Sequence, residues 1–365
     1  MIPGVWRADP RRERVNRSGP HLRPRCAALS LRSAAPPRIG GAGRPIAACV
    51  LGTIAALCVG CVDELPKQQD IERMRLLGLA TYAGELGSPA ATPAPGETLH
   101  LELLVAFPNG QSGAELKVSW FACATVPLAT PLDSCDEDTF VGVGLNGPPT
   151  GSLTVPTQTS SGEPPEGLVV FGIACDGGED LEIPAGGVGI DSISDIRCEG
   201  ARDQQIFTTT VPVQCPAPPD GTEVVGCERN EPNTRPPPLE ITLDGEAWTP
   251  DAPLDIDTRE VHRAKYVVEV GVPDETAYES YTFRPYASTA TETRTEELLV
   301  TFGSDGGRLE GPYRVLSFDH QRDDMEYTAP RAETVPADRE IRFFFVTRDD
   351  RGGMRMETRV ARVRP

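Results

Sequence analysis

Positive charge, aromatic side chains and histidines are all scarce in this chain of 365 residues. It has 35 Lys and Arg residues against 54 Asp and Glu residues, so its formal net charge is −19. A chain this acidic lacks the basic surface that neutralises phosphates, which argues against nucleic acid as a partner. Aromatic residues make up 6% of the chain, and only four residues are His. The first shortage disfavours an aromatic sugar-binding strip, and the second disfavours a histidine-based metal site.

Motifs of catalysis are also missing. The sequence contains no GxSxG nucleophile elbow, no GxxxxGK[ST] phosphate loop and no HExxH metal motif. Carboxylate pairs of the kind that hydrolyse glycosides occur throughout a chain with this many acids, so their presence decides nothing. We therefore predict that the protein is not an enzyme and has neither catalytic residues nor a cofactor.

The chain's clearest long apolar run is too short to cross a membrane. Residues 46–60 give 15 apolar or small residues, whereas a spanning helix needs about 20. Residues 1–60 contain ten Arg residues and only two acids, a net charge of +8. A positive flank, a short apolar stretch and a small-residue exit predict a secretory signal peptide. Because the apolar run begins late, we expect the true start to lie after Met1.

The apolar run ends in Leu57-Cys58-Val59-Gly60-Cys61. This resembles a bacterial lipobox, although Cys58 stands where the lipobox usually has Leu. The resemblance implies that residues 1–60 are removed, that Cys61 is lipidated, and that residues 61–72 are a tether. Several acyl chains would hold the protein durably to a membrane. An ordinary signal peptide or a short anchor is the alternative.

Residues 61–365 carry 25 bases and 52 acids, a net charge of −27. Val62 follows Cys61, whereas Asp at this position is the usual inner-membrane retention signal of Gram-negative lipoproteins. The predicted location is therefore the cell envelope, at the outer membrane on its periplasmic or surface face.

Short β-strands account for most of the remaining sequence. In residues 98–106, Leu99, Leu101 and Leu103 occupy alternate positions, the pattern of a half-buried strand. Residues 343–346 are apolar on both faces, which predicts a central strand. Residues 70–82 fit a helix or a strand, and we favour a strand. The other strands are expected at residues 116–123, 167–174, 204–213, 239–243, 265–272, 281–284, 297–302, 325–328, 340–347 and 354–363.

A proline-rich segment divides these strands into two regions. Residues 216–238 contain Pro-Ala-Pro-Pro and Arg-Pro-Pro-Pro, which read as a semi-rigid spacer. The first region spans residues 73–215 and the second spans residues 239–365. Many short strands joined by Gly and Pro turns predict an all-β chain with two β-sandwich domains.

Two groups of residues resemble immunoglobulin-like modules. Trp120 lies three residues before Cys123, as on the third strand of such sandwiches, although the Cys–Trp–Cys spacing of true immunoglobulin domains is absent. Residues 327–330 and the Asp-Asp-Arg-Gly-Gly turn at 349–353 look like bacterial Ig-like or PKD-like repeats. With the lipobox, the chain resembles bacterial surface lipoproteins built from such modules. The resemblance implies a fold but no activity, because such folds host many functions.

Six cysteines follow Cys61, and they are Cys123, Cys135, Cys175, Cys198, Cys215 and Cys227. An even number in an exported chain predicts disulfides, with 15 connectivities open. Each sequential pair flanks one irregular polar stretch, so we expect Cys123–Cys135, Cys175–Cys198 and Cys215–Cys227. A metal site is not expected, because CxxC spacings and His partners are missing.

Acidic loops leave calcium binding open as an alternative to ordinary solvated acids. Calcium needs six to eight oxygen ligands, but none of the loops matches the D-x-[DN]-x-[DN]-G pattern. The acids in question are Asp133, Asp136, Glu137, Asp138, Asp176, Glu179, Asp180, Glu182, Asp319, Asp323 and Asp324.

The two tryptophans after Cys61 receive different interpretations. We expect Trp120 in a core, whereas turn residues surround Trp248, which makes it the weak candidate for an exposed ligand-binding residue. Taken together, the sequence predicts a membrane-anchored envelope lipoprotein that binds or scaffolds without catalysis. The alternative is an accessory module that binds carbohydrate or cell wall through Trp248. The expected partners are envelope proteins, which would bind at exposed edge strands, and cell-surface glycans.

Overall fold

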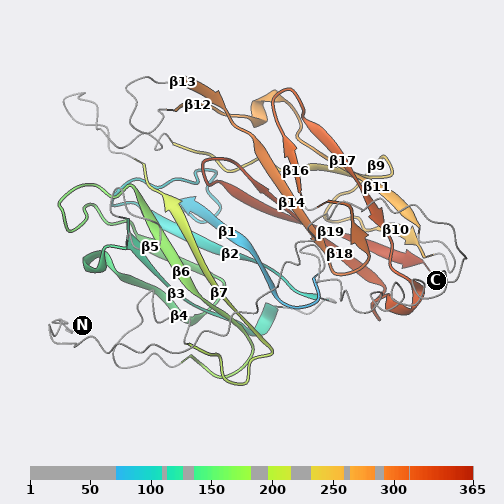
Figure 1. The fold of residues 1–365 in the computed structure, drawn as a ribbon, viewed down its shortest axis with the longest axis horizontal. Coiled ribbons are helices and arrows are strands. Elements are labelled where there is room, and N and C mark those ends of the chain that lie inside the picture. Colours follow the sequence, from blue (N-terminus) through green and yellow to red (C-terminus); the bar gives the residue numbers. More distant parts are fainter. Residues whose placement is uncertain are drawn as a thin grey trace, which may run out of the picture. The chain divides into compact units, whose positions relative to one another are not determined.

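The structure is a computed structural model. It describes residues 71–108, 113–125, 135–181, 196–214, 232–258, 264–283, 292–311 and 313–364. All of these residues belong to one compact unit, which spans Asp63–Pro365. Its helical elements within the described ranges are three-residue 3₁₀ turns, so the predicted all-β fold is confirmed (Figure 1). The predicted anchor Cys61, the leader and the Cys215–Cys227 pair lie outside the described residues.

The first group of strands forms two sheets that face each other. One sheet has the order β1-β2-β5 and the other has the order β4-β3-β6-β7. Every pairing within them is antiparallel. The strands are β1 (Arg75–Ala83), β2 (Thr98–Ala106), β3 (Leu116–Ala124), β4 (Val141–Gly147), β5 (Thr150–Thr154), β6 (Gly167–Asp176) and β7 (Asp203–Pro212).

Alternation along these strands builds the core of the first sandwich. Leu99, Leu101 and Leu103 on β2 point into it and meet Val118 and Trp120 on β3. Burying alternate residues from two sheets is the pattern that the strand spacing predicts. The core position of Trp120 is confirmed. For the ambiguous residues 70–82, the preferred strand is confirmed from Arg75 on, because β1 pairs with β2 along its length.

Glycines make room for the Trp120 ring, and this explains two strands that the sequence pattern missed. β4 and β5 contain Gly144 and Gly151, which weaken the strand signal. A Cβ atom at Gly151 would lie 2.8 Å from Cζ2 of Trp120, and one at Gly144 would lie 3.1 Å from its Nε1. A side chain at Gly151 would therefore displace the indole, and one at Gly144 would crowd its edge.

The second group of strands forms a second sandwich. Its sheets have the orders β10-β19-β18-β14-β16 and β15-β17-β11-β8-β9, with a separate ribbon of β12 and β13. The pairing of β10 with β19 is parallel. The strands are β8 (Glu240–Leu243), β9 (Glu246–Ala247), β10 (Leu254–Asp257), β11 (Lys265–Gly271), β12 (Ser280–Phe283), β13 (Glu292–Thr295), β14 (Leu298–Ser304), β15 (Arg308–Leu309), β16 (Tyr313–Leu316), β17 (Arg322–Thr328), β18 (Glu340–Arg348) and β19 (Met354–Arg364).

β18 is a central strand, as its doubly apolar sequence predicts. It pairs with β14 on one side and with β19 on the other. Phe343 and Phe345 point into the core of the second sandwich, where Tyr327 packs edge-to-face on Phe343 with ring centroids 4.7 Å apart. Phe344 and Val346 point the other way and are also buried.

The outward-pointing residues of β18 are buried because the two sandwiches pack sheet against sheet. Val346 packs with Ala80, Tyr82 and Leu104, which lie on the outer faces of β1 and β2. Phe344 packs with Ile71 and Ala106. β1 and the adjoining part of β2 are therefore covered on both faces, once by their own sandwich and once by the second sandwich.

Close approach and polar contacts fix this contact between the sandwiches. A Cβ atom at Gly78 would overlap Sδ of Met354, so β1 and β19 approach closely because residue 78 has no side chain. Arg348 donates to the carbonyl oxygen of Leu77 and to Oγ1 of Thr301. The backbone N–H of Ile71 donates to the carbonyl oxygen of Ser304 at 3.0 Å. Ile71, the first described residue, thus lies at the contact between the sandwiches.

Candidate functional site

Two of the three predicted disulfides lie within the described residues, and both are confirmed. Cys123 is bonded to Cys135, and Cys175 is bonded to Cys198. Cys123 lies on β3 and Cys175 on β6, which are neighbouring strands of one sheet. Both side chains point to the outer face of that sheet, where they join small apolar clusters separate from the main core. Each bond therefore lies in an apolar cluster on the outer face of the sheet.

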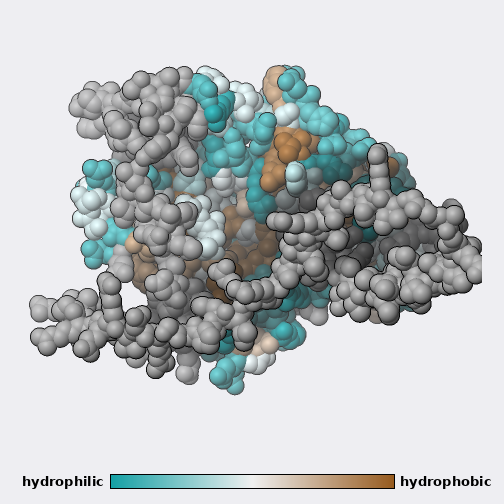
Figure 2. Space-filling model, viewed as in Figure 1, coloured by the Kyte–Doolittle hydropathy of each residue, from teal (hydrophilic) through white to brown (hydrophobic). Residues whose placement is uncertain are grey.

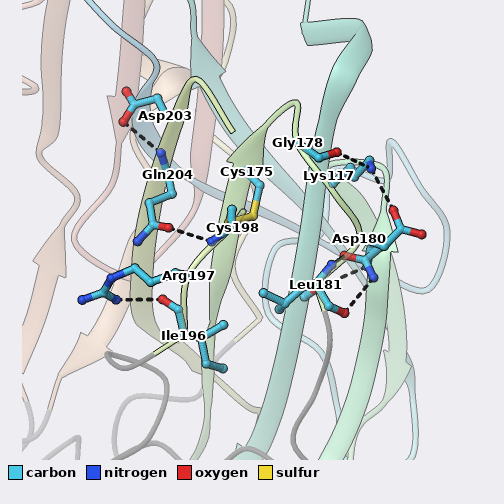
Figure 3. Close-up of a disulfide and its surroundings, with 12 residues drawn as sticks. Lys117, Cys175, Gly178, Asp180, Leu181, Ile196, Arg197, Cys198, Asp203 and Gln204 are labelled. Carbon is cyan, nitrogen blue, oxygen red and sulfur yellow. Dashed lines mark hydrogen bonds and ion pairs between the residues drawn. A yellow bond between two sulfur atoms is a disulfide. The ribbon is translucent and has the colours of Figure 1, made fainter. Parts of the chain in front are cut away.

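Polar contacts hold both ends of the loop that the Cys175–Cys198 bond closes (Figure 3). Nζ of Lys117 donates to the carbonyl oxygen of Gly178 at 2.9 Å and to Asp180 at 2.8 Å. At the other end, the N–H of Cys198 donates to Oε1 of Gln204 at 2.9 Å. These contacts make the site a structural brace.

The predicted exposure of Trp248 is wrong. This side chain is 1% exposed and packs edge-to-face on Phe343, with ring centroids 4.8 Å apart. Its Nε1 donates to the carbonyl oxygen of Val360 at 3.0 Å. The reason is the tight turn at Asp244 and Gly245, which have φ angles of 51° and 81°. That turn pairs β8 with β9. Trp248, the residue after β9, therefore lies over the core instead of in solvent.

Several acids of the acidic loops engage groups of the protein itself. Asp136 is buried and accepts from the N–H of Ser160, while Asp176 is paired with Arg202 at 2.7 Å. Asp323 lies 3.5 Å from Arg314. Across the described residues, no three His, Cys, Asp or Glu side chains are grouped so that they could hold a metal ion. Asp133 and Glu182 lie outside the described residues, and calcium binding stays an untested alternative.

A buried ionic cluster was not predicted from the sequence. Arg351 lies in the turn between β18 and β19, and its side chain is only 8% exposed. Its Nε donates to Glu296 at 2.7 Å, and its Nη2 donates to Oδ1 of Asn233 at 2.9 Å. Nη2 also pairs with Glu279. With Asp349, these residues form what we call the clasp: Asn233, Glu279, Glu296, Asp349 and Arg351.

Asp349 organises the turn that carries Arg351. Its carboxylate accepts from the N–H of Gly353 at 2.7 Å, from the N–H of Arg351 at 2.9 Å, and from Nδ2 of Asn233 at 3.2 Å. A Cβ atom at Gly353 would overlap this carboxylate, so the turn requires glycine there. In the sequence, the Asp-Asp-Arg-Gly-Gly stretch reads only as a polar turn, and no local signal reveals its burial.

Burial changes the titration of the two acids at the centre of the clasp. It raises the pKa of Glu296 to about 7, and the nearby charge of Asp349 adds to the shift. Burial also raises the pKa of Asp349 to about 6, although its hydrogen bonds act in the opposite direction. Both acids therefore change charge near neutral pH, where ordinary carboxyl groups stay ionised.

An apolar patch remains exposed on the outer face of the second sandwich. β16 is an edge strand, and its Tyr313 and Val315 are 52% and 41% exposed. They lie opposite Thr301 and Leu299 on β14, while Phe318 follows the strand and is 46% exposed. Brown atoms gather over the region that β14 and β16 occupy (Figure 2). This patch continues the sheet face whose other part, on β18, is covered by the first sandwich.

Comparisons with known proteins assign no family. No family model matches the chain, and no curated protein matches it. Among solved structures it is similar to one titled Escherichia coli alpha-2-macroglobulin activated by porcine elastase, at 13% identity and a TM-score of 0.19. The match covers 80% of this chain and 22% of that protein. The described part of the chain holds no helix with the length and hydropathy of a membrane span. A structural likeness at this level supports no inference about function.

Proposed function

We propose that the chain is an exported envelope lipoprotein that is anchored at the outer membrane through Cys61 and acts by binding, without catalysis. The positively charged leader, the apolar run and the lipobox-like end support export and lipidation. Two disulfides support an oxidising compartment, because such bonds persist outside the cytosol. The two sandwiches are immunoglobulin-like modules in this proposal, which suits a role in recognition.

The observation that carries the binding role is the patch of Tyr313 and Val315, which lie on one face of β16, with the exposed Phe318 just after the strand. Large apolar side chains that gather on one exposed face mark interaction sites more often than chance exposure does. Because the patch continues a face that already packs against a β-sheet, the occupant that fits it is a β-rich envelope protein. Exposed charges of both signs follow or flank the patch in the sequence, among them Asp319 and Arg322. The matching partner surface is therefore apolar at its centre and polar at its rim.

The position of Trp248 does not support a glycan-binding role. Trp248 is buried with its ring nitrogen bonded to Val360, so its face cannot stack on a sugar. We therefore place protein binding first.

Site-specific crosslinking in the envelope tests the binding role. We expect a photo-reactive residue in place of Val315 to capture one β-rich envelope protein, and a Tyr313→Ser, Val315→Thr variant to lose a crosslink made from position 318. The matched control is Val267→Thr, because Val267 is 47% exposed on β11 of the opposite sheet. Equal capture from positions 315 and 267, or capture of a second copy of this chain, would overturn the proposal.

Mass spectrometry of the intact membrane-bound protein tests the anchor separately. The expected species begins at Cys61 and carries acyl chains, and Cys61→Ala releases the protein from the membrane. An uncleaved chain that begins at Met1 would sink the lipoprotein assignment.

A further inference from the structure

The clasp holds the segment that joins the two sandwiches. Asn233 lies in this segment and is 1% exposed. Its side chain contacts Arg351 and Asp349 in the second sandwich, and its carbonyl oxygen accepts from the N–H of Ala91 in the first at 2.8 Å. Two residues later, the N–H of Arg235 donates to the carbonyl oxygen of Pro89 at 2.7 Å. One short segment is thus bonded to both sandwiches, and the clasp fixes its orientation.

Further contacts tie the same segment to the clasp. The hydroxyl of Thr234 donates to Glu279, and a β-bridge pairs Thr234 with Ala90. The guanidinium of Arg235 lies over the Tyr82 ring, 4.2 Å from its centroid. A change in the clasp therefore reaches the first sandwich through residues 233–235.

The charges of the clasp do not balance when every acid is ionised. Glu279, Glu296 and Asp349 then contribute three negative charges against the single positive charge of Arg351. Asp350 accepts a hydrogen bond from Tyr281 and adds a further acid. Arg351 lies over the Tyr281 ring at 4.8 Å. Of the cations nearby, Arg294 pairs with Glu292, and Arg235 donates to the carbonyl oxygen of Met354. Unbalanced buried charge is costly, and hydration relieves it.

We infer that the clasp is a proton-operated lock on the junction between the two sandwiches, closed when Glu296 and Asp349 are protonated and loosened when both are ionised. With two protons bound, the cluster reduces to the Glu279–Arg351 pair and is neutral. Without them it carries a net charge of −2 in a site that is mostly closed to water. Opening the clasp lets water reach the carboxylates, so ionisation favours the open state.

The direction of the pH effect follows from the raised pKa values. A carboxyl group whose pKa is higher in the closed state binds its proton more tightly there, so lowering the pH favours closure. The pKa of Glu296 is about 7 in the closed clasp, and in the open clasp it returns to the ordinary value of 4.5. Between pH 8 and pH 5.5, this single group shifts the closing equilibrium roughly thirtyfold. An exported protein is exposed to pH changes of this size, because the pH around it follows that of the external medium.

Hydrogen exchange of the junction amides tests the lock directly. The reporters are the N–H groups of Ala91 and Arg235, which cross between the junction segment and the first sandwich. After correction for intrinsic exchange, we expect their protection to fall roughly thirtyfold from pH 5.5 to pH 8. Glu296→Gln keeps the hydrogen-bond acceptor for Arg351 but cannot ionise, so protection stays high at pH 8. Glu297→Gln is the matched control, because Glu297 is the exposed next residue.

Asp349→Asn is the second variant, and it is expected to flatten the same profile in part. Core amides of β18, such as that of Phe343, must keep their protection, because the lock is local. Unchanged protection of Ala91 and Arg235 across this pH range would overturn the inference. So would a full pH response in Glu296→Gln, or a parallel loss of protection throughout the core. These results do not depend on Cys61 or on the patch at Tyr313, so the inference and the proposed function fail separately.

Discussion

Replacing Gly172 with Ala adds one methyl group where the first sandwich has no space for it. Gly172 lies on β6 between β3 and β7, opposite Trp120 on one side and Phe207 on the other. An added Cβ atom would overlap the carbonyl oxygen of Ser119 and lie 2.8 Å from Phe207 and 2.9 Å from Trp120. The first obstacle is backbone, which cannot rotate away. We therefore expect β3 and β6 to move apart.

The cost follows from the size of the overlap. Overpacking a core costs typically about 1–3 kcal/mol, and contacts on both flanking strands place this case near the upper end, at about 3 kcal/mol. Urea unfolding with the disulfides intact measures this as a lower midpoint at an unchanged slope. For a protein of this size the melting temperature falls by roughly 4–5 °C.

The control for this substitution is Gly142→Ala on β4 of the same sheet. A Cβ atom at Gly142 meets nothing within 4 Å. Replacing it restricts the unfolded chain and is expected to be neutral or to stabilise by about 0.4–1 kcal/mol. If the two variants have equal stability to within about 0.5 kcal/mol, the close packing around Trp120 described above is incorrect.

Three further predictions concern the disulfide, the buried tryptophan and the titrating acid. Cys175→Ala with Cys198→Ala opens a loop whose ends are 23 residues apart, so we expect a loss of roughly 3 kcal/mol in urea unfolding, and unchanged stability would contradict a bracing role. Trp248→Phe leaves the carbonyl oxygen of Val360 unpaired, which is expected to cost about 1–3 kcal/mol of stability. In the wild type, strong iodide quenching of the two tryptophans after Cys61 would contradict their burial. Because the pKa of Glu296 is raised to about 7, the folded state binds the proton more tightly, and the unfolding free energy should increase by roughly 2 kcal/mol from pH 8 to pH 5.5, whereas a flat profile in the wild type would refute the shift.

Alternating hydrophobicity predicted most strands because it reflects a geometric constraint on every half-buried sheet. The expected strand at residues 98–106 coincides with β2, and the doubly apolar middle of residues 343–346 correctly marked β18 as central. The pattern did not predict β4 and β5, whose residues make room for a side chain on a neighbouring strand. The glycines of β4 and β5 weaken the local signal and are needed by Trp120, which lies on another strand.

The clasp could not be predicted, because its members come from four separate segments. Asn233 and Arg351 are 118 residues apart, and Glu279 and Glu296 flank the β12–β13 ribbon. Each of them belongs to a polar stretch that reads as solvated surface. Trp248 shows the opposite error. Its neighbours in the sequence are turn residues, which suggested that it is exposed, but the two-residue turn at Asp244 and Gly245 brings its side chain back to the core.

The burial of β1 and β2 on both faces has a practical consequence for dividing this protein. A cut within residues 216–238 looks natural on the sequence, because modules on a string are usually separated at such linkers. Here each half would be released with a bare apolar sheet face, since Leu104 would lose Val346 and Ala106 would lose Phe344. Exposed sheet faces of this kind promote aggregation. The two halves should therefore be produced together, and recombining them tests whether either can serve as an independent building block.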